Sequence, residues 1–248
     1  MGAIVPGEGV RLEGGETIRA PVVVSNADPR RTLTLCEDKG PETLRRKVER
    51  WRIDSPVLKI NCALSGLPRF TAAAGTEPHR AMVTISTGID ATQAAYETSR
   101  RGVPAPGWCE LYFHTAYDGS VAPEGRHAMS VFAQYVPYEL AEGDWESRRQ
   151  AIADAAMAEV ERFAPGVSDL VEHRQVLGPP DIEERIGLTG GHIFQGDCLA
   201  EQLWDRRFGP RLPLDGVYLC GAATHPGGSV IAINGRNAAM AVLQDVGG

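Results

Sequence analysis

The sequence has few of the features that mark zinc modules, disulfide-stapled domains or nucleic-acid-binding proteins. It has no C-x-x-C pair, and its cysteines are odd in number and widely spaced, which excludes a disulfide framework and the usual zinc ligand spacing. These are Cys36, Cys62, Cys109, Cys198 and Cys220. It also lacks a basic excess, because the formal net charge is −7 and the isoelectric point is near 5.4. We therefore expect no nucleic-acid partner.

Membrane and export signals are also absent. No apolar run approaches the ~20 residues needed to cross a bilayer, and the opening "MGAIVPGEG" lacks the basic and apolar regions of a signal peptide. Internal repeats and low-complexity linkers are missing as well. With 248 residues and 43% apolar composition, the chain is predicted to be a cytoplasmic globular protein with a packed core.

The first thirty residues predict a β-meander that leads into a buried strand. "GVRL" and "TIRA" flank a turn at Gly14 and Gly15, as in a hairpin. A short apolar run at residues 22–25 indicates a covered strand. Asp28 and Pro29 are then typical of the N-cap and first position of a helix.

The rest of the chain alternates irregularly between strand and helix patterns. The clearest helix is predicted to begin at Asp144 and to stop at Pro165. We predict the α+β (mixed α/β) class, with a mixed β-sheet flanked by helices in the middle of the chain. Because both ends carry buried strands and glycine-rich turns, residues 41–204 are predicted to form a domain inserted between residues 1–40 and 205–248.

A glycine-rich stretch near the C-terminus gives the strongest functional signal. "DGVYL" predicts a strand that leads into "CGAATHPGGSVIAINGRNAA", in which Pro226 to Ser229 are predicted to open a helix. Unpaired amides at a helix N-terminus favour an electron-rich or anionic group, and Ala232, Gly235 and Ala239 would form a stripe that admits a close neighbour. The alternative is a purely structural strand-turn-helix, since glycine clusters are common.

Four segments carry a resemblance to a known family. "VYLCGAATHPGGSVIAINGRNAA" resembles the C-terminal flavin-binding segment of the phytoene-desaturase-like FAD-dependent oxidoreductases, which include carotenoid desaturases and isomerases. "GLTGGHIFQGDCLAEQLW" resembles the preceding segment, especially in the pyridine-nucleotide-oxidoreductase-like branch, and "GVRLEGGETIRAPVVVSNADP" resembles the meander and strand of the FAD domain. "SPVLKINCALSGLPRF" is similar to the start of the substrate domain. The likeness covers nearly the whole chain in the right order.

The resemblance implies FAD as the cofactor and a set of residues near the flavin. Backbone N–H groups of the C-terminal segment would stabilise negative charge on the reduced ring. The implied cofactor-binding residues are Gly221, Ala222, Gly227, Gly228, Ser229 and Val230, with Asn26 and Ala27 as weaker candidates. Ser229 stands where the family more often has a third glycine.

The dinucleotide fingerprint of that family is not found. The sequence offers only Gly7-x-Gly9, with Leu12 at the third glycine position and no preceding strand. The resemblance therefore implies a C-terminal half, with an incomplete Rossmann-like FAD domain that lacks its N-terminal βαβ unit. We expect the chain alone to bind FAD weakly or not at all, and to be inactive without the missing N-terminal half. Such a chain would expose an apolar patch, and we expect it to form homodimers.

Other candidates favour structural interpretations. His192, Asp197 and His225 match no familiar metal motif, so no metal is predicted, and His225 is expected to stabilise a turn. A set of aromatic residues would either line an apolar substrate cavity or pack in the sheet. These are Trp108, Tyr112, Phe113, Phe132 and Tyr135. No catalytic residue is identified, and the alternative to an oxidoreductase half is a non-catalytic binding or interaction module.

Overall fold

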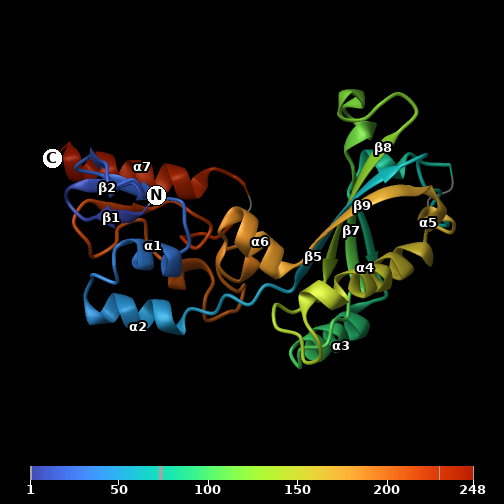
Figure 1. Cartoon of the computed structure of the whole chain (residues 1–248), viewed down its shortest axis with the longest axis horizontal. Helices are drawn as coiled ribbons and strands as arrows, with labels where there is room; N and C mark the ends of the chain where they lie inside the picture. Colours follow the sequence, from blue (N-terminus) through green and yellow to red (C-terminus); the bar gives the residue numbers. More distant parts are fainter. Residues whose placement is uncertain (1, 73–74, 229, 248) are drawn as a thin grey trace. The chain divides into compact units, whose positions relative to one another are not determined.

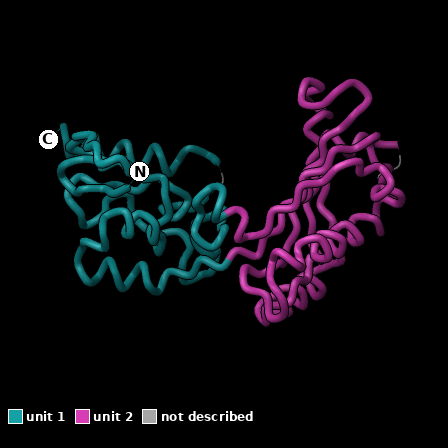
Figure 2. Tube along the Cα trace, in the orientation of Figure 1, with its two compact units in different colours: residues 1–54, 183–248 teal, residues 55–182 magenta. Residues whose placement is uncertain are grey.

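Residues 2–72, 75–228 and 230–247 are described by the structure, a computed structural model, and they divide into two compact units (Figure 2). Unit 1 comprises residues 1–54 and 183–248, and unit 2 comprises residues 55–182. The prediction placed these boundaries after residues 40 and 204. They lie elsewhere because Leu44, Val48 and Trp51 share a hydrophobic cluster with Leu33 and Phe208. The roles assigned to the two parts stay predictions.

Unit 1 contains a three-stranded antiparallel sheet and a two-stranded parallel sheet. The first has the order β1-β2-β3, of which β1 and β2 are labelled in Figure 1, and the second pairs β10 with β4. The strands are β1 (Ala3–Val5), β2 (Gly9–Arg11), β3 (Thr17–Arg19), β4 (Val23–Ser25) and β10 (Val217–Leu219). The helices are α1 (Pro29–Leu35), α2 (Glu42–Arg50) and α7 (Ile233–Val246), with 3-10 turns η4 (Thr189–Gly191) and η5 (Trp204–Arg206).

The predicted N-terminal meander is confirmed. β2 and β3 pair antiparallel across the turn that holds Gly15, which has φ +87°. Gly7 and Gly9 lie in and after the β1–β2 turn, so this partial glycine match is part of a hairpin and does not open a helix. Asp28 is the N-cap of α1, and its carboxylate accepts hydrogen bonds from the amides of Arg30 and Arg31.

Unit 2 is built on one five-stranded sheet of order β6-β7-β8-β5-β9. Its strands are β5 (Val57–Leu64), β6 (Val83–Ser86), β7 (Trp108–Phe113), β8 (His127–Gln134) and β9 (Val171–Leu177). Its helices are α3 (Ile89–Ser99), α4 (Trp145–Glu161) and α5 (Val167–Leu170), with 3-10 turns η1 (Pro78–Arg80), η2 (His114–Ala116) and η3 (Gly119–Val121). Helix α6 (Pro179–Ile186) crosses the boundary to unit 1.

The predicted mixed α/β class is confirmed, but the sheet of unit 2 is not mixed. Every pairing between its described strands is antiparallel. β6, β7 and β8 are neighbours both in the chain and in the sheet, and each runs antiparallel to the one before it, with α3 in the connection between β6 and β7. The parallel pairing of the molecule is found in unit 1, between β4 and β10.

Helix α4 packs on one face of this sheet and defines the core of unit 2. Its buried side chains Ile152, Met157 and Val160 join the inward side chains of β5, β7 and β8 in a single cluster. Asp144 caps the helix by accepting from the amide of Ser147, as the sequence predicts. Among the described residues, no helix has the length and apolar character needed to cross a membrane.

We predict that the two isoleucines of unit 2 differ sharply in their contribution to stability. Ile60 is fully buried on β5, whereas Ile89 is 87% exposed at the start of α3. Ile60→Ala should lower the free energy of unfolding by about 2–5 kcal/mol, since it leaves a cavity in a close-packed core. Ile89→Ala is the matched control and should change it by less than ~0.5 kcal/mol. Urea unfolding followed by circular dichroism compares them, and equal losses would contradict this packing.

Candidate functional site

The carboxyl ends of β4 and β10 lie side by side and bring distant parts of the sequence together. Asn26 and Ala27 follow β4, and Gly221 and Ala222 follow β10. The side-chain amide of Gln195 links the two ends: it donates to the Asn26 carbonyl (2.8 Å) and accepts from the Ala223 amide (3.2 Å). Four of the eight predicted cofactor residues, Asn26, Ala27, Gly221 and Ala222, therefore lie at the carboxyl end of the parallel pair. Dinucleotide-binding folds hold their ligands at this end of the strands.

Position 221 requires a glycine because neighbouring protein atoms leave no room for a side chain. A Cβ atom added there would lie 2.3 Å from Gln195 Oε1 and 2.8 Å from the Asn26 carbonyl oxygen. Both distances are shorter than van der Waals contact, so a larger residue would push Gln195 away. The absence of a side chain at Gly221 thus allows the Gln195 bridge to form.

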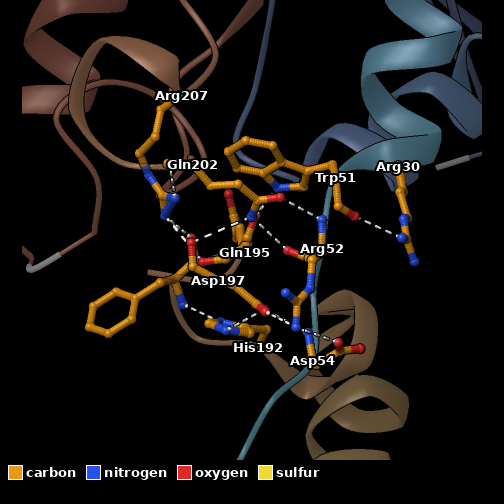
Figure 3. A network of polar contacts seen from close by, with 11 residues as sticks. Arg30, Trp51, Arg52, Asp54, His192, Gln195, Asp197, Gln202 and Arg207 are labelled. Atoms are coloured by element: carbon orange, nitrogen blue, oxygen red, sulfur yellow. Dashed lines mark hydrogen bonds and ion pairs between the residues drawn. The ribbon is translucent and has the colours of Figure 1, made fainter. Parts of the chain in front are cut away.

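Residues 187–207 carry this bridge and are fixed by a network of polar contacts within unit 1 (Figure 3). The indole Nε1 of Trp51 donates to the Gln195 carbonyl (2.9 Å). The side-chain amide of Gln202 exchanges two hydrogen bonds with the backbone of Arg52 (2.7 and 3.0 Å). Asp28 accepts from the Thr189 hydroxyl (2.6 Å), which ties the same segment to the start of α1.

Arg207 is buried, with 2% of its surface exposed, beneath the glycine-rich turn. Its guanidinium donates to backbone carbonyls on both sides, including those of Phe194 (2.8 Å) and Ala222 (3.2 Å). Burial lowers the pKa of Arg207, although nearby Asp197 opposes this effect. The cation is therefore held by carbonyl dipoles and fixes residues 194–202 against the turn. No sequence pattern indicates this role, because the carbonyl acceptors have no side-chain signature.

His192 is a buried neutral imidazole in this network. Its Nδ1 accepts from the Phe194 amide (3.2 Å), which leaves the ring proton on Nε2, 3.5 Å from an oxygen of Asp197. Burial and the Arg207 cation lower the pKa of His192 to about 4, against an opposing effect of Asp54. His192 is thus structural, and among the described residues no three His, Cys, Asp or Glu side chains converge on a metal site.

The Gly-Gly turn differs from the prediction. The sequence placed Gly227 and Gly228 at the opening of a helix, but α7 begins at Ile233, with Ala232 as its N-cap at φ +60°. Protein side chains lie close to both glycines: a Cβ at Gly228 would be 2.4 Å from the Phe194 ring, and one at Gly227 would be 3.3 Å from Arg207 Nε. Ser229 lies outside the described residues.

The residues after the turn are open to solvent. Val230 is fully exposed, Ile231 is 50% exposed and Ile233 is 39% exposed. Helix α7 has no side-chain hydrogen bond at its N-cap, so the amides of its first turn lack a side-chain acceptor there. These apolar side chains and the first-turn amides of α7 form an exposed surface, which we call the α7 head (residues 230–233 and 235).

The predicted small-residue stripe lies on the exposed side of α7. Ala232, Gly235 and Ala239 are exposed, whereas Ala238 and Ala241 are buried. A close neighbour for this stripe stays a prediction. Asn234, which the sequence analysis did not single out, is buried, and its amide donates to the Thr224 carbonyl (2.9 Å). The His225 ring is exposed, and the carbonyl of His225 accepts from Asn237 (3.2 Å), so this residue anchors the turn through its backbone.

The aromatic candidates of unit 2 are divided between the two faces of the sheet. Phe113 is buried in the core, as the packing alternative holds. Trp108, Tyr112 and Phe132 are half-buried on the opposite face. Tyr135 packs edge-to-face on Tyr96, with ring centroids 5.6 Å apart, beside a pocket.

Two parallel strands whose carboxyl ends meet a glycine-rich turn before a helix are the arrangement of a Rossmann-like class of α/β protein. The comparisons agree with this class, although no protein-family model matches the chain. A solved oxidoreductase from Methanosarcina mazei superposes with a TM-score of 0.54 at 13% identity, covering 96% of this chain and 48% of that one, which shows a shared fold.

Sequence relatives identify the family. The chain is 38% identical to pyridine nucleotide-disulfide oxidoreductase domain-containing protein 2 of Rattus norvegicus, over 96% of this chain and 44% of the relative. It is 26% identical to the neurosporene-forming phytoene desaturase of Rhodobacter capsulatus, over 95% of this chain and 45% of that protein. The chain is therefore a relative of the phytoene-desaturase-like FAD-dependent oxidoreductases and matches their C-terminal half. It spans less than half the length of these relatives.

We predict that unit 1 loses stability as the pH falls from about 6.5 to about 4. The pKa of His192 is about 4 in the folded protein and about 6.5 in the unfolded chain. The unfolded chain therefore binds more protons between these two pH values. The full shift corresponds to about 3 kcal/mol. Urea unfolding at several pH values measures the slope. His192→Asn keeps an acceptor for the Phe194 amide and should flatten the curve; an unchanged slope would assign the effect to another group.

A pair of glycine substitutions tests the Gln195 bridge. Gly221→Ala should cost about 1–3 kcal/mol, because the new Cβ overlaps Gln195 Oε1. Gly235 lies within α7, and no atom is within 4 Å of a Cβ added there. Gly235→Ala should therefore raise the free energy of unfolding by about 0.5–1 kcal/mol. Thermal unfolding of both variants gives the comparison. A neutral Gly221→Ala would show that the bridge contributes little.

Proposed function

We propose that this chain supplies the flavin-facing half of an FAD-dependent oxidoreductase, with the isoalloxazine ring lying against the α7 head. The single observation that carries the proposal is the exposed, uncapped start of α7 beside the joined ends of β4 and β10. Free amides at a helix N-terminus favour negative charge, and the neighbouring exposed Val230 and Ile231 offer an apolar surface for a flat ring.

The residues near the strand ends have separate roles in this proposal. FAD, when bound, would accept a hydride from the substrate or donate one to it. Asn26, Ala27, Gly221 and Ala222 would lie along the cofactor, and the first-turn amides of α7 would stabilise negative charge at the ring. Gly227 and Gly228 would act indirectly, since they make room for Arg207 and Phe194. No residue of this chain is assigned an acid or base role.

The edge of β4 indicates how the other half of the FAD domain would join. Val23 and Ser25 bond to β10, so the N–H and C=O of Val24 point to the opposite edge, and its side chain is 47% exposed. Parallel sheets are normally covered and extended, which a two-stranded sheet does not achieve. We propose that a parallel strand from the missing N-terminal half pairs with β4. Met240, Leu243 and Val246 of α7, all exposed, would be covered with it.

The substrate surface is proposed to be the face of the unit 2 sheet opposite α4. Phe132 and Trp108 on this face offer an apolar platform, in keeping with a largely apolar substrate. The competing proposal is a non-catalytic interaction module. This alternative is favoured because the side chains of Arg207 and Phe194 already fill the space beside Gly227 and Gly228. A homodimer that covers the β4 edge remains a further prediction.

The test combines the two halves. This chain alone should retain no stoichiometric FAD after gel filtration, whereas its mixture with a polypeptide that carries the N-terminal half of the rat relative should show flavin absorbance. Gly235→Glu, which adds negative charge in the first turn of α7, should lower the flavin reduction potential of the assembled pair. Gly235→Gln is the neutral control of similar size.

Two results would contradict the proposal. If the combined halves form a complex without FAD, the interaction-module alternative is favoured. If the two Gly235 variants have the same reduction potential, the flavin does not lie at the α7 head. FAD retained by this chain alone would contradict only the need for the other half.

A further inference from the structure

We draw no further inference here: the strongest candidate, the pocket of about 460 Å³ that the start of α3 forms with Ser86 and Tyr135 in unit 2, is lined by exposed and half-buried side chains, and nothing in the part of the chain that the structure describes shows what covers it.

Discussion

The Gln195 amide joins the ends of two parallel strands, and the geometry of unit 1 depends on this one bridge. It donates to the Asn26 carbonyl after β4 and accepts from the Ala223 amide after β10, so that residues about 200 positions apart meet. Gly221 has no side chain because the bridge occupies that space. Trp51 holds the backbone of Gln195 from the other side. Gly221 and Trp51 are thus explained by the need to keep the Gln195 amide in one orientation.

The buried charges of unit 1 are stabilised mainly by backbone groups and less by ion pairs with each other. Arg207 is buried and contacts carbonyl oxygens, and the Asp197 carboxylate pairs instead with Arg52, at 3.5 Å. His192 stays neutral because burial and the nearby guanidinium both disfavour its protonation. The interior beneath the glycine-rich turn therefore carries a cation held by backbone carbonyls, although burial lowers the pKa of Arg207.

The sequence predicted the local elements of this fold better than their contacts. The N-terminal hairpin, the cap at Asp28 and the helix after Asp144 follow from turn and capping chemistry, which acts over a few residues. The start of α7 was placed too early, because a Gly-Gly turn looks alike whether it opens a helix or precedes one. Gln195 and Arg207 act on backbone atoms far along the chain, so no spacing rule reveals them. The aromatic residues of the sheet were found, but only strand register separates Phe113 from Phe132.

Unit 1 is discontinuous, since its two segments are separated by the whole of unit 2. On the ribosome, unit 2 therefore emerges as one uninterrupted stretch and has all its strands available early. β4, in contrast, must wait without its partner until β10 has been synthesised nearly two hundred residues later. Translation thus imposes an order of assembly, in which the inserted sheet folds first and unit 1 closes last.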